Sequence, residues 1–344
     1  MPPLHFDPDY QRAIAPFAGI VPPIPKDALD LRRINDATIA TILRSTPSTP
    51  NPSQIHYTSS DGTPLILHHF PAPTTSPGPQ PAILYLHGGG LLSGSVPLFT
   101  PDIQNYCTQT ATQIFAPAYR LAPEHPYPTP LEDIYAALLH LHTHAAELNI
   151  DAARIGILGI SAGGGLAVAT ALMARDKGLK PEVGRLVLVY PMLDDRSVEL
   201  GKGEEGVRGF LTWTERKNVL GWGAYLRGGI NGGDHDGGVG ENGGGENEED
   251  GGGGEEKGGK EKGYYAVPAR VEDVSGLPRT YIDVGGLDLF RGECVEFAGR
   301  LGRAGVEVEF HLYPGVPHAW DWMAKNAPVT KRAMENRVRA LKDL

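Results

Sequence analysis

The sequence of 344 residues contains only two cysteines, Cys107 and Cys294. This number is too small for a disulfide framework, and no Cys-x-x-Cys pattern indicates a zinc or redox site. Basic residues are also few, with 31 Lys and Arg against 41 Asp and Glu, and no basic face for nucleic acid is evident. The segment Met1–Asp7 has neither a basic start nor an apolar stretch of signal-peptide length. We therefore expect a cytoplasmic protein that does not bind nucleic acid.

A single stretch, Ile155–Ala174, is long and apolar enough to suggest a membrane span. It contains Ser161 and five glycines, at 156, 159, 163, 164 and 165. These small residues favour a buried strand, a tight turn and a buried helix. We expect no membrane span.

Glycine is abundant, but its excess is local. Residues 228–263 contain 17 of the 45 glycines together with 10 Asp or Glu and three Lys, so they carry −7 of the chain's net charge of −10. A tract of this composition cannot bury enough apolar surface to offset its ordering entropy, and we interpret it as disordered. A calcium site is the alternative, but the spacing of the carboxylates matches no EF-hand loop.

Short apolar runs alternate with helical patterns from residue 54 onward, which is typical of a mostly parallel sheet covered by helices on both faces. The predicted strands are Ile55–Thr58, Leu65–Phe70, Ala82–Leu86, Gln113–Ala118, Arg154–Ile160, Leu186–Tyr190, Thr280–Val284 and Val306–Leu312. The predicted helices are 26–43, 128–147, 162–177, 292–303 and 328–341. The fold class is therefore α/β, and the first two strands suggest an antiparallel edge.

Two segments interrupt this alternation. Residues 1–50 are rich in proline and have the character of an appended lobe before the main domain at 51–344. The interval between Pro191 and Arg279 holds helix-compatible sequence near 212–226 and then the acidic tract, and we interpret it as an excursion from the sheet.

The strongest chemical signal is Gly159-Ile160-Ser161-Ala162-Gly163, which follows an apolar run and opens a helical one. In a strand–turn–helix of this kind the residues beside the serine must be small, and the hydroxyl stands at the carboxyl end of the sheet. Ser161 is the candidate nucleophile.

A second signal, His87-Gly88-Gly89-Gly90, directly follows a predicted strand. Consecutive glycines let the backbone point N–H groups at one spot, which suits an anionic tetrahedral intermediate. The N–H groups of Gly89, Gly90 and Ala162 are therefore expected to form an oxyanion hole. His87 and Gly88 are expected to brace this loop.

A serine hydroxyl needs a neighbouring base, and the base needs an orienting carboxylate. In this strand–turn–helix arrangement the acid follows the serine in the chain and the base follows the acid. Asp288 and His318 each lie just beyond a predicted strand, whereas their competitors Asp283 and His311 lie within strands. No His/Asp cluster has metal-ligand spacing, and we expect no metal or organic cofactor.

These residues give the chain a resemblance to the hormone-sensitive lipase family of α/β-hydrolases, the group of small microbial and fungal esterases. Besides the motifs around His87 and Ser161, the resemblance includes Tyr119–Pro126, Tyr190–Asp194 and Gly276–Pro278. It implies an eight-stranded α/β-hydrolase sheet and a helical cap built from residues 1–50 and about 195–270. By similarity the catalytic set is Ser161, Asp288 and His318.

Several positions depart from the family pattern, among them Leu289 and Phe290, where the family usually has Pro and Leu. Ile160 stands where the family usually has an acidic residue or Thr, Leu91 where it has an aromatic residue, and Gly292 where it has Asp. None of these changes removes a reacting group, so they bear on rate, stability and the shape of the acyl pocket.

The predicted function is a serine hydrolase of carboxylic esters, and the resemblance implies short to medium acyl chains, such as an acetyl ester in secondary metabolism. A lactone or amide hydrolase would use the same machinery. A small-molecule receptor of this fold is a further alternative, although the receptors that resemble the family lack the histidine that is present here as His318. A partner-binding scaffold remains open as well.

Overall fold

The computed structural model describes residues 4–17, 19, 23–43, 52–73, 77–197, 205–226 and 263–344. The acidic tract at 228–263 lies outside these residues except for Gly263, so its disorder stays a prediction.

Within the described residues, eight strands form one sheet in the order β1-β2-β4-β3-β5-β6-β7-β8. Their bounds are β1 Ser53–Thr58, β2 Pro64–Phe70, β3 Gln80–Leu86, β4 Gln113–Pro117, β5 Ile150–Ile160, β6 Arg185–Val189, β7 Thr280–Gly285 and β8 Val308–Tyr313. β2 runs antiparallel to both β1 and β4, and all other neighbours are parallel. The predicted α/β class, mostly parallel sheet and antiparallel edge are confirmed.

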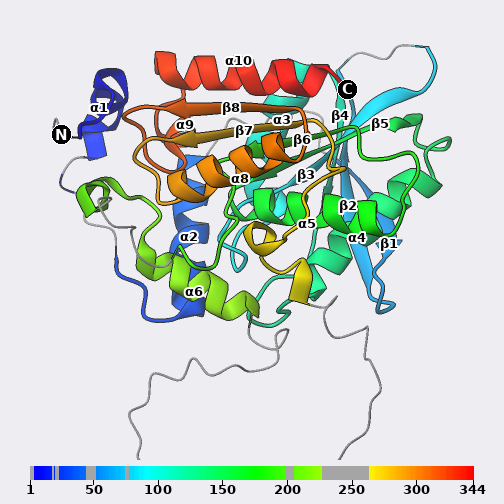
Figure 1. The fold of residues 1–344 in the computed structure, drawn as a ribbon, viewed down its shortest axis with the longest axis horizontal. Coiled ribbons are helices and arrows are strands. Elements are labelled where there is room, and N and C mark those ends of the chain that lie inside the picture. The colour runs from blue at the N-terminus through cyan, green and yellow to red at the C-terminus, as the bar shows by residue number, and fades with distance from the viewer. Residues whose placement is uncertain are drawn as a thin grey trace, which may run out of the picture.

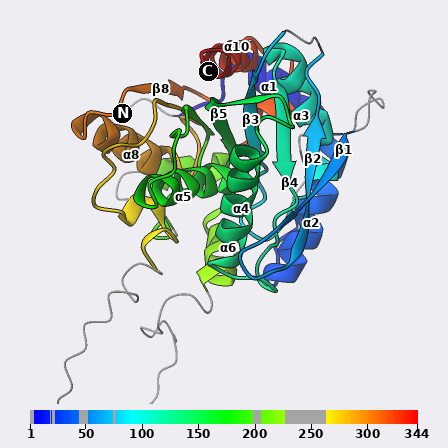
Figure 2. The ribbon, with the colours of Figure 1, turned by 90° about the vertical axis from the view of Figure 1, so that its right-hand side faces the viewer.

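Helices cover both faces of the sheet (Figures 1 and 2). On one face lie α3 (Val96–Thr110) and α10 (Pro328–Lys342), and on the other lie α4 (Thr129–Thr143), α5 (Ala162–Asp176) and α8 (Arg291–Arg303). The double cover explains why the central strands are apolar on both sides, as in β6, where every residue is buried. The short helices α1 (Pro8–Ile14) and α9 (Trp320–Met323) pack against each other.

Two further helices, α2 (Ala28–Ile42) and α6 (Glu215–Leu226), contact each other although they lie far apart in the sequence (Figure 1). The described part of the chain also has three 3-10 turns, at Ala15–Phe17, Glu205–Phe210 and Pro268–Arg270. The segments before β1 and after β6 therefore meet in space.

Helix α3 was not among the predicted helices because two prolines obscure its pattern. Pro97 stands in the first turn, where a missing N–H has no helical acceptor, and Pro101 lies one turn further on. The Ser95 hydroxyl caps the helix by accepting a hydrogen bond from the N–H of Leu98.

The apolar stretch Ile155–Ala174 divides at Ser161 between β5 and α5, as predicted. No helix in the described ranges is long and apolar enough to cross a membrane. Because β3, β5, β7 and β8 are parallel, the loops that follow them emerge at the same edge of the sheet, and these loops carry the predicted site residues.

Candidate active site

Ser161 stands between the last residue of β5 and the first residue of α5, with φ 55° and ψ −118°. A positive φ is strained for a residue with a side chain, so the surrounding structure must hold this turn. A Cβ on Gly159 would lie 2.3 Å from the carbonyl oxygen of Gly163, and one on Gly163 would lie 2.2 Å from the carbonyl oxygen of Leu86. Both flanking positions therefore require glycine, which explains the Gly-x-Ser-x-Gly pattern.

The side chains of Ser161, His318 and Asp288 form a continuous chain of contacts. Ser161 Oγ lies 2.9 Å from His318 Nε2, and His318 Nδ1 lies 2.8 Å from Asp288 Oδ2. All three residues are buried. Because a carboxylate only accepts hydrogen bonds, Nδ1 carries the imidazole proton and Nε2 faces the serine as an acceptor. The arrangement can remove a proton from the serine hydroxyl.

The two competing residues lie elsewhere. Asp283, on β7, accepts a hydrogen bond of 2.6 Å from Arg337 Nε of α10. His311, on β8, contacts Glu309 through Nε2 at 2.6 Å. Asp283 and His311 are therefore engaged by Arg337 and Glu309, and no hydrogen bond among the described residues joins either of them to Ser161.

Aromatic rings surround the imidazole of His318. Tyr190 and Phe290 present their rings edge to face at centroid distances of 4.6 and 5.1 Å, and Trp213 lies at 6.5 Å. The hydroxyl of Thr212 donates to the main-chain carbonyl of His318 at 2.7 Å. The imidazole is therefore held in place both through its own loop and by its neighbours.

The glycine loop after β3 passes directly over the serine, since a Cβ on Gly88 would lie 3.3 Å from Ser161 Cβ. Gly89 and Gly90 have φ values of 127° and 62°. Within the described part of the chain, the N–H groups of Gly89, Gly90 and Ala162 donate to no protein acceptor. Three main-chain donors are therefore available beside Ser161.

His87 is buried beneath this loop between two aromatic rings. It stacks on Tyr119 at 4.4 Å and on Phe99 at 5.3 Å, and its Nδ1 donates to the carbonyl of Gly88 at 2.7 Å. Burial lowers the pKa of His87 to about 4. A neutral ring with this bond supports the predicted bracing role.

Helix α2 contacts the glycine loop from outside the sheet. Asp36 Oδ1 accepts from the N–H of Gly94 at 2.8 Å, and Asn35 Nδ2 donates to the hydroxyl of Ser93 at 3.2 Å. Ser93 in turn donates to the carbonyl of Gly89 through its hydroxyl, at 2.6 Å, and through its N–H, at 3.0 Å. The segment before β1 thus fixes the far end of the loop.

Trp213 and α6 cover the loop from the other side. A Cβ on Gly90 would lie 2.2 Å from Trp213 Cη2, and one on Gly221 of α6 would lie 2.7 Å from the carbonyl oxygen of Gly90. The indole is fixed by a hydrogen bond of 3.1 Å from Nε1 to Oδ1 of the buried Asn218. Trp213 and Asn218 lie in the predicted excursion, but the sequence carries no signal for their role, because their contacts with the glycine loop form only in the folded chain.

A narrow apolar recess borders Ala162. Its lining comes from the loop after β3, one face of α5, the loop after β6 and the end of α6, and includes Leu91, Gly165, Met192, Trp222 and Tyr225. Its accessible volume is about 10 Å³, which is about the space of one water molecule.

The departures from the family pattern at Leu91, Ile160 and Gly292 occupy different environments. Leu91 has φ 70° and lines the recess. The replacement of an aromatic ring by leucine therefore changes the lining of the recess. Ile160 is buried as the last residue of β5, and Gly292 is exposed in the first turn of α8. Among the described residues there is no group of three or more His, Cys, Asp or Glu side chains that could hold a metal ion.

Comparisons with known proteins agree with this geometry. A family model for the α/β-hydrolase fold matches residues 83–236 and 256–321. Esterase LipI of Mycobacterium tuberculosis is 27% identical over 274 residues, which cover 80% of this chain and 76% of that protein. The structure of a bacterial heroin esterase matches with a TM-score of 0.77 and 32% identity over 98% of both chains.

A hyperthermophilic esterase from the archaeon Pyrobaculum calidifontis has the same fold, with a TM-score of 0.78 at 22% identity over 99% of this chain and 98% of that one. The matched residues include the glycine loop, Ser161, Asp288 and His318. The chain therefore belongs to the α/β-hydrolase family, among the carboxylesterases of the hormone-sensitive lipase type.

Proposed function

We propose that this protein hydrolyses carboxylic esters with Ser161 as nucleophile, His318 as general base and Asp288 as the orienting carboxylate. The observation that carries the proposal is the chain of contacts from Ser161 Oγ to His318 Nε2 at 2.9 Å and from His318 Nδ1 to Asp288 at 2.8 Å. The esterases among its relatives support ester substrates.

In the first half of the reaction, Ser161 Oγ attacks the ester carbonyl carbon while His318 Nε2 takes the hydroxyl proton. Asp288 stabilises the imidazolium that forms. The negative charge on the carbonyl oxygen is stabilised by the N–H groups of Gly89, Gly90 and Ala162, which donate to no other described acceptor. His318 then passes its proton to the departing alcohol, leaving an acyl group on Ser161.

In the second half, water replaces the alcohol. His318 takes a proton from the water, whose oxygen attacks the acyl carbon, and the same N–H groups stabilise the second intermediate. The proton returns to Ser161 as the carboxylic acid leaves.

The described parts of 1–50 and 195–270 act as a cap in this proposal. α2 supports the glycine loop through Asp36 and Asn35, and Trp213 covers it. His87 and Gly88 brace the same loop from below. We expect acyl chains of short to medium length, the range that the resemblance to the family implies. Both cysteines are free and buried thiols, which supports a reducing, cytoplasmic location.

The test is release of p-nitrophenol from esters of increasing acyl length. We expect activity that declines for long chains and falls by about 10⁴-fold or more in Ser161→Ala and in His318→Ala. His311→Ala is the matched control, because this histidine lies on β8 and faces Glu309. Full activity in Ser161→Ala would contradict the proposal.

A further inference from the structure

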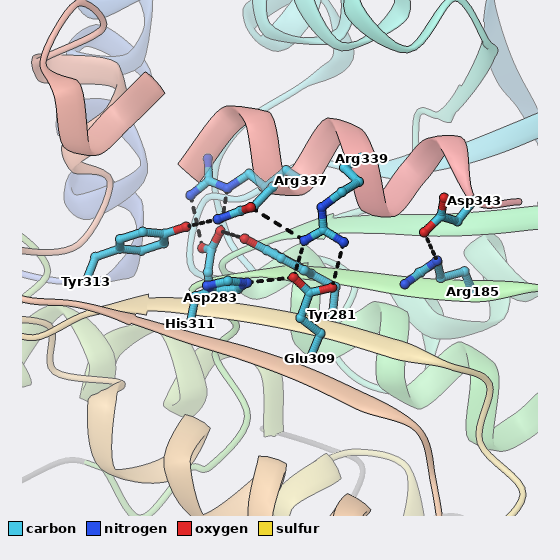
Figure 3. Close-up of polar contacts among 10 residues, drawn as sticks. Arg185, Tyr281, Asp283, Glu309, His311, Tyr313, Arg337, Arg339 and Asp343 are labelled. Atoms are coloured by element: carbon cyan, nitrogen blue, oxygen red, sulfur yellow. Dashed lines mark hydrogen bonds and ion pairs between the residues drawn. The ribbon is translucent and has the colours of Figure 1, made fainter. Parts of the chain in front are cut away.

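Arg337 of α10 is a fully buried arginine, and it lies outside the chain of contacts that carries the chemistry. Its guanidinium binds the carboxylate of Asp283 on β7 in a bidentate manner, with Nε to Oδ2 at 2.6 Å and Nη2 to Oδ1 at 3.0 Å (Figure 3). The hydroxyl of Tyr281 donates to the same carboxylate at 2.9 Å. Helix α10 is thereby tied to β7, which lies next to the edge strand β8.

The remaining face of the guanidinium reaches the segment that carries His318. Nη1 of Arg337 donates to Oδ2 of Asp321, three residues beyond His318 and within α9. The other oxygen of Asp321 accepts from the hydroxyl of Tyr190 at 3.0 Å. Asp321 is itself buried, so its contacts leave it little freedom to move.

The same guanidinium also packs against the aromatic side chains behind the imidazole. Its carbon lies 5.6 Å from the ring centre of Tyr190 and 5.3 Å from that of Trp320. Tyr190 is the ring that meets His318 edge to face at 4.6 Å. Arg337 therefore acts on the histidine by two routes, through Asp321 along the chain and through Tyr190 across space.

The energetics argue for a role in positioning. An apolar group of similar volume often stabilises a fold as well as a buried ion pair does, because desolvation offsets the attraction between the charges. Hydrogen bonds to a planar guanidinium are directional, however, and three fixed donors hold two carboxylates at defined places. Such an arrangement suits a loop whose base must stay within a few tenths of an ångström of its nucleophile.

We propose that Arg337 is a positioning residue for His318, which it holds in place by joining Asp321 of the histidine-bearing segment to Asp283 of the sheet. The inference rests on the proposed function, in which His318 is the base. It adds α10, the last helix of the chain, to the parts of the fold that determine the turnover rate.

The test is the substitution Arg337→Lys, since lysine keeps the charge but cannot bind both carboxylates in this geometry. Arg339→Lys is the matched control, because Arg339 lies on the same helix and pairs with Glu309 at a more exposed position (Figure 3). Active sites are counted by titration of the reactive serine with a fluorophosphonate, so that kcat refers only to folded, competent molecules.

We expect Arg337→Lys to lower kcat per titrated site by about ten- to a hundredfold while KM changes by less than about threefold. Arg339→Lys should match the wild type in both constants. A merely structural role would reduce the number of titrated sites and leave kcat per site unchanged, which would overturn the inference.

Asp321→Asn provides a second variant should Arg337→Lys fail to fold. It leaves the pair between Arg337 and Asp283 intact and removes only the ionic contact to the histidine-bearing segment. A wild-type kcat in Asp321→Asn would also overturn the inference. Ser161→Ala is run alongside: activity that survives in it would overturn the proposed function and the inference together, whereas an inactive Ser161→Ala beside a fully active Arg337→Lys would overturn the inference alone.

Discussion

The indole of Trp213 rests directly on Gly90, so closely that a Cβ at this glycine would lie 2.2 Å from Cη2 of the ring. The indole cannot readily retreat, because Asn218 holds its Nε1 and Asn218 donates in turn to the carbonyl of Ser197 at 2.7 Å. The segment around Trp213 and the glycine loop are therefore fitted to each other at the point where the proposed oxyanion hole lies.

The first prediction concerns Gly90→Ala. The new methyl group must displace either Trp213 or the loop, which moves the N–H of residue 90 away from the oxyanion, and we expect kcat to fall by about 10²-fold. Gly178→Ala is the matched control, since Gly178 has a similar φ of 67° but a Cβ there would have no atom within 4 Å. Steady-state kinetics on a p-nitrophenyl ester check both variants.

The control should lose about 1 kcal/mol of unfolding free energy from backbone strain and keep its kcat. Adding Trp213→Ala to Gly90→Ala removes the steric conflict, so the double variant should recover part of the lost rate. If Gly90→Ala were as active as the control, the contact between Trp213 and Gly90 would not determine the position of the glycine loop.

The second prediction concerns Asp36, on α2. Asp36→Ala removes the acceptor for the N–H of Gly94 and leaves that end of the loop less constrained, so kcat should fall by about tenfold with little change in KM. Asp30→Ala is the control, because Asp30 lies on the same helix and, in the described part of the chain, its carboxylate accepts hydrogen bonds only from Lys26 and Arg33 nearby. Equal kcat and KM in the two variants would contradict a role of α2 in positioning the glycine loop.

The third prediction is a pH dependence of stability that arises from His87. Its pKa is about 4 in the folded protein, below the ordinary value of 6.5, because burial disfavours the imidazolium. The unfolded chain therefore binds a proton that the folded protein does not, and the free energy of unfolding contributed by His87 falls by about 3 kcal/mol as the pH drops from about 6.5 to about 4.

Urea denaturation of the wild type and of His87→Asn between pH 4 and pH 7 measures this contribution. The difference in unfolding free energy between the two proteins should be largest near pH 7 and shrink toward pH 4. A difference that stays constant with pH would mean that His87 has the same pKa in the folded and the unfolded protein, which would contradict this prediction.

Much of this arrangement could be predicted from the sequence because its determinants are local. The Gly-x-Ser-x-Gly pattern follows from backbone contacts within one turn, and the eight apolar runs follow from burial on both faces of the sheet. Asp288 and His318 could be singled out from Asp283 and His311 by their positions after strands.

The residues that surround these groups could not be predicted in the same way. Trp213 and Asp36 reach the glycine loop from segments more than 50 residues away along the chain, and Arg337 meets Asp283 across 54 positions. Neither the hydrophobic periodicity of the sequence nor the spacing of its motifs indicates such contacts. Helix α3 was missed for a different reason, since Pro97 and Pro101 are tolerated by its position and packing although their local preference opposes a helix.

Covalent trapping decides whether Ser161 is the nucleophile. The wild-type protein is treated with a fluorophosphonate, its intact mass is measured, and the modified peptide is sequenced by mass spectrometry. We predict a single phosphonyl group per chain, carried by Ser161, with ester hydrolysis lost in step with its formation and no adduct in Ser161→Ala. An adduct on another residue that accompanies the loss of activity, or undiminished hydrolysis by fully modified protein, would contradict this assignment.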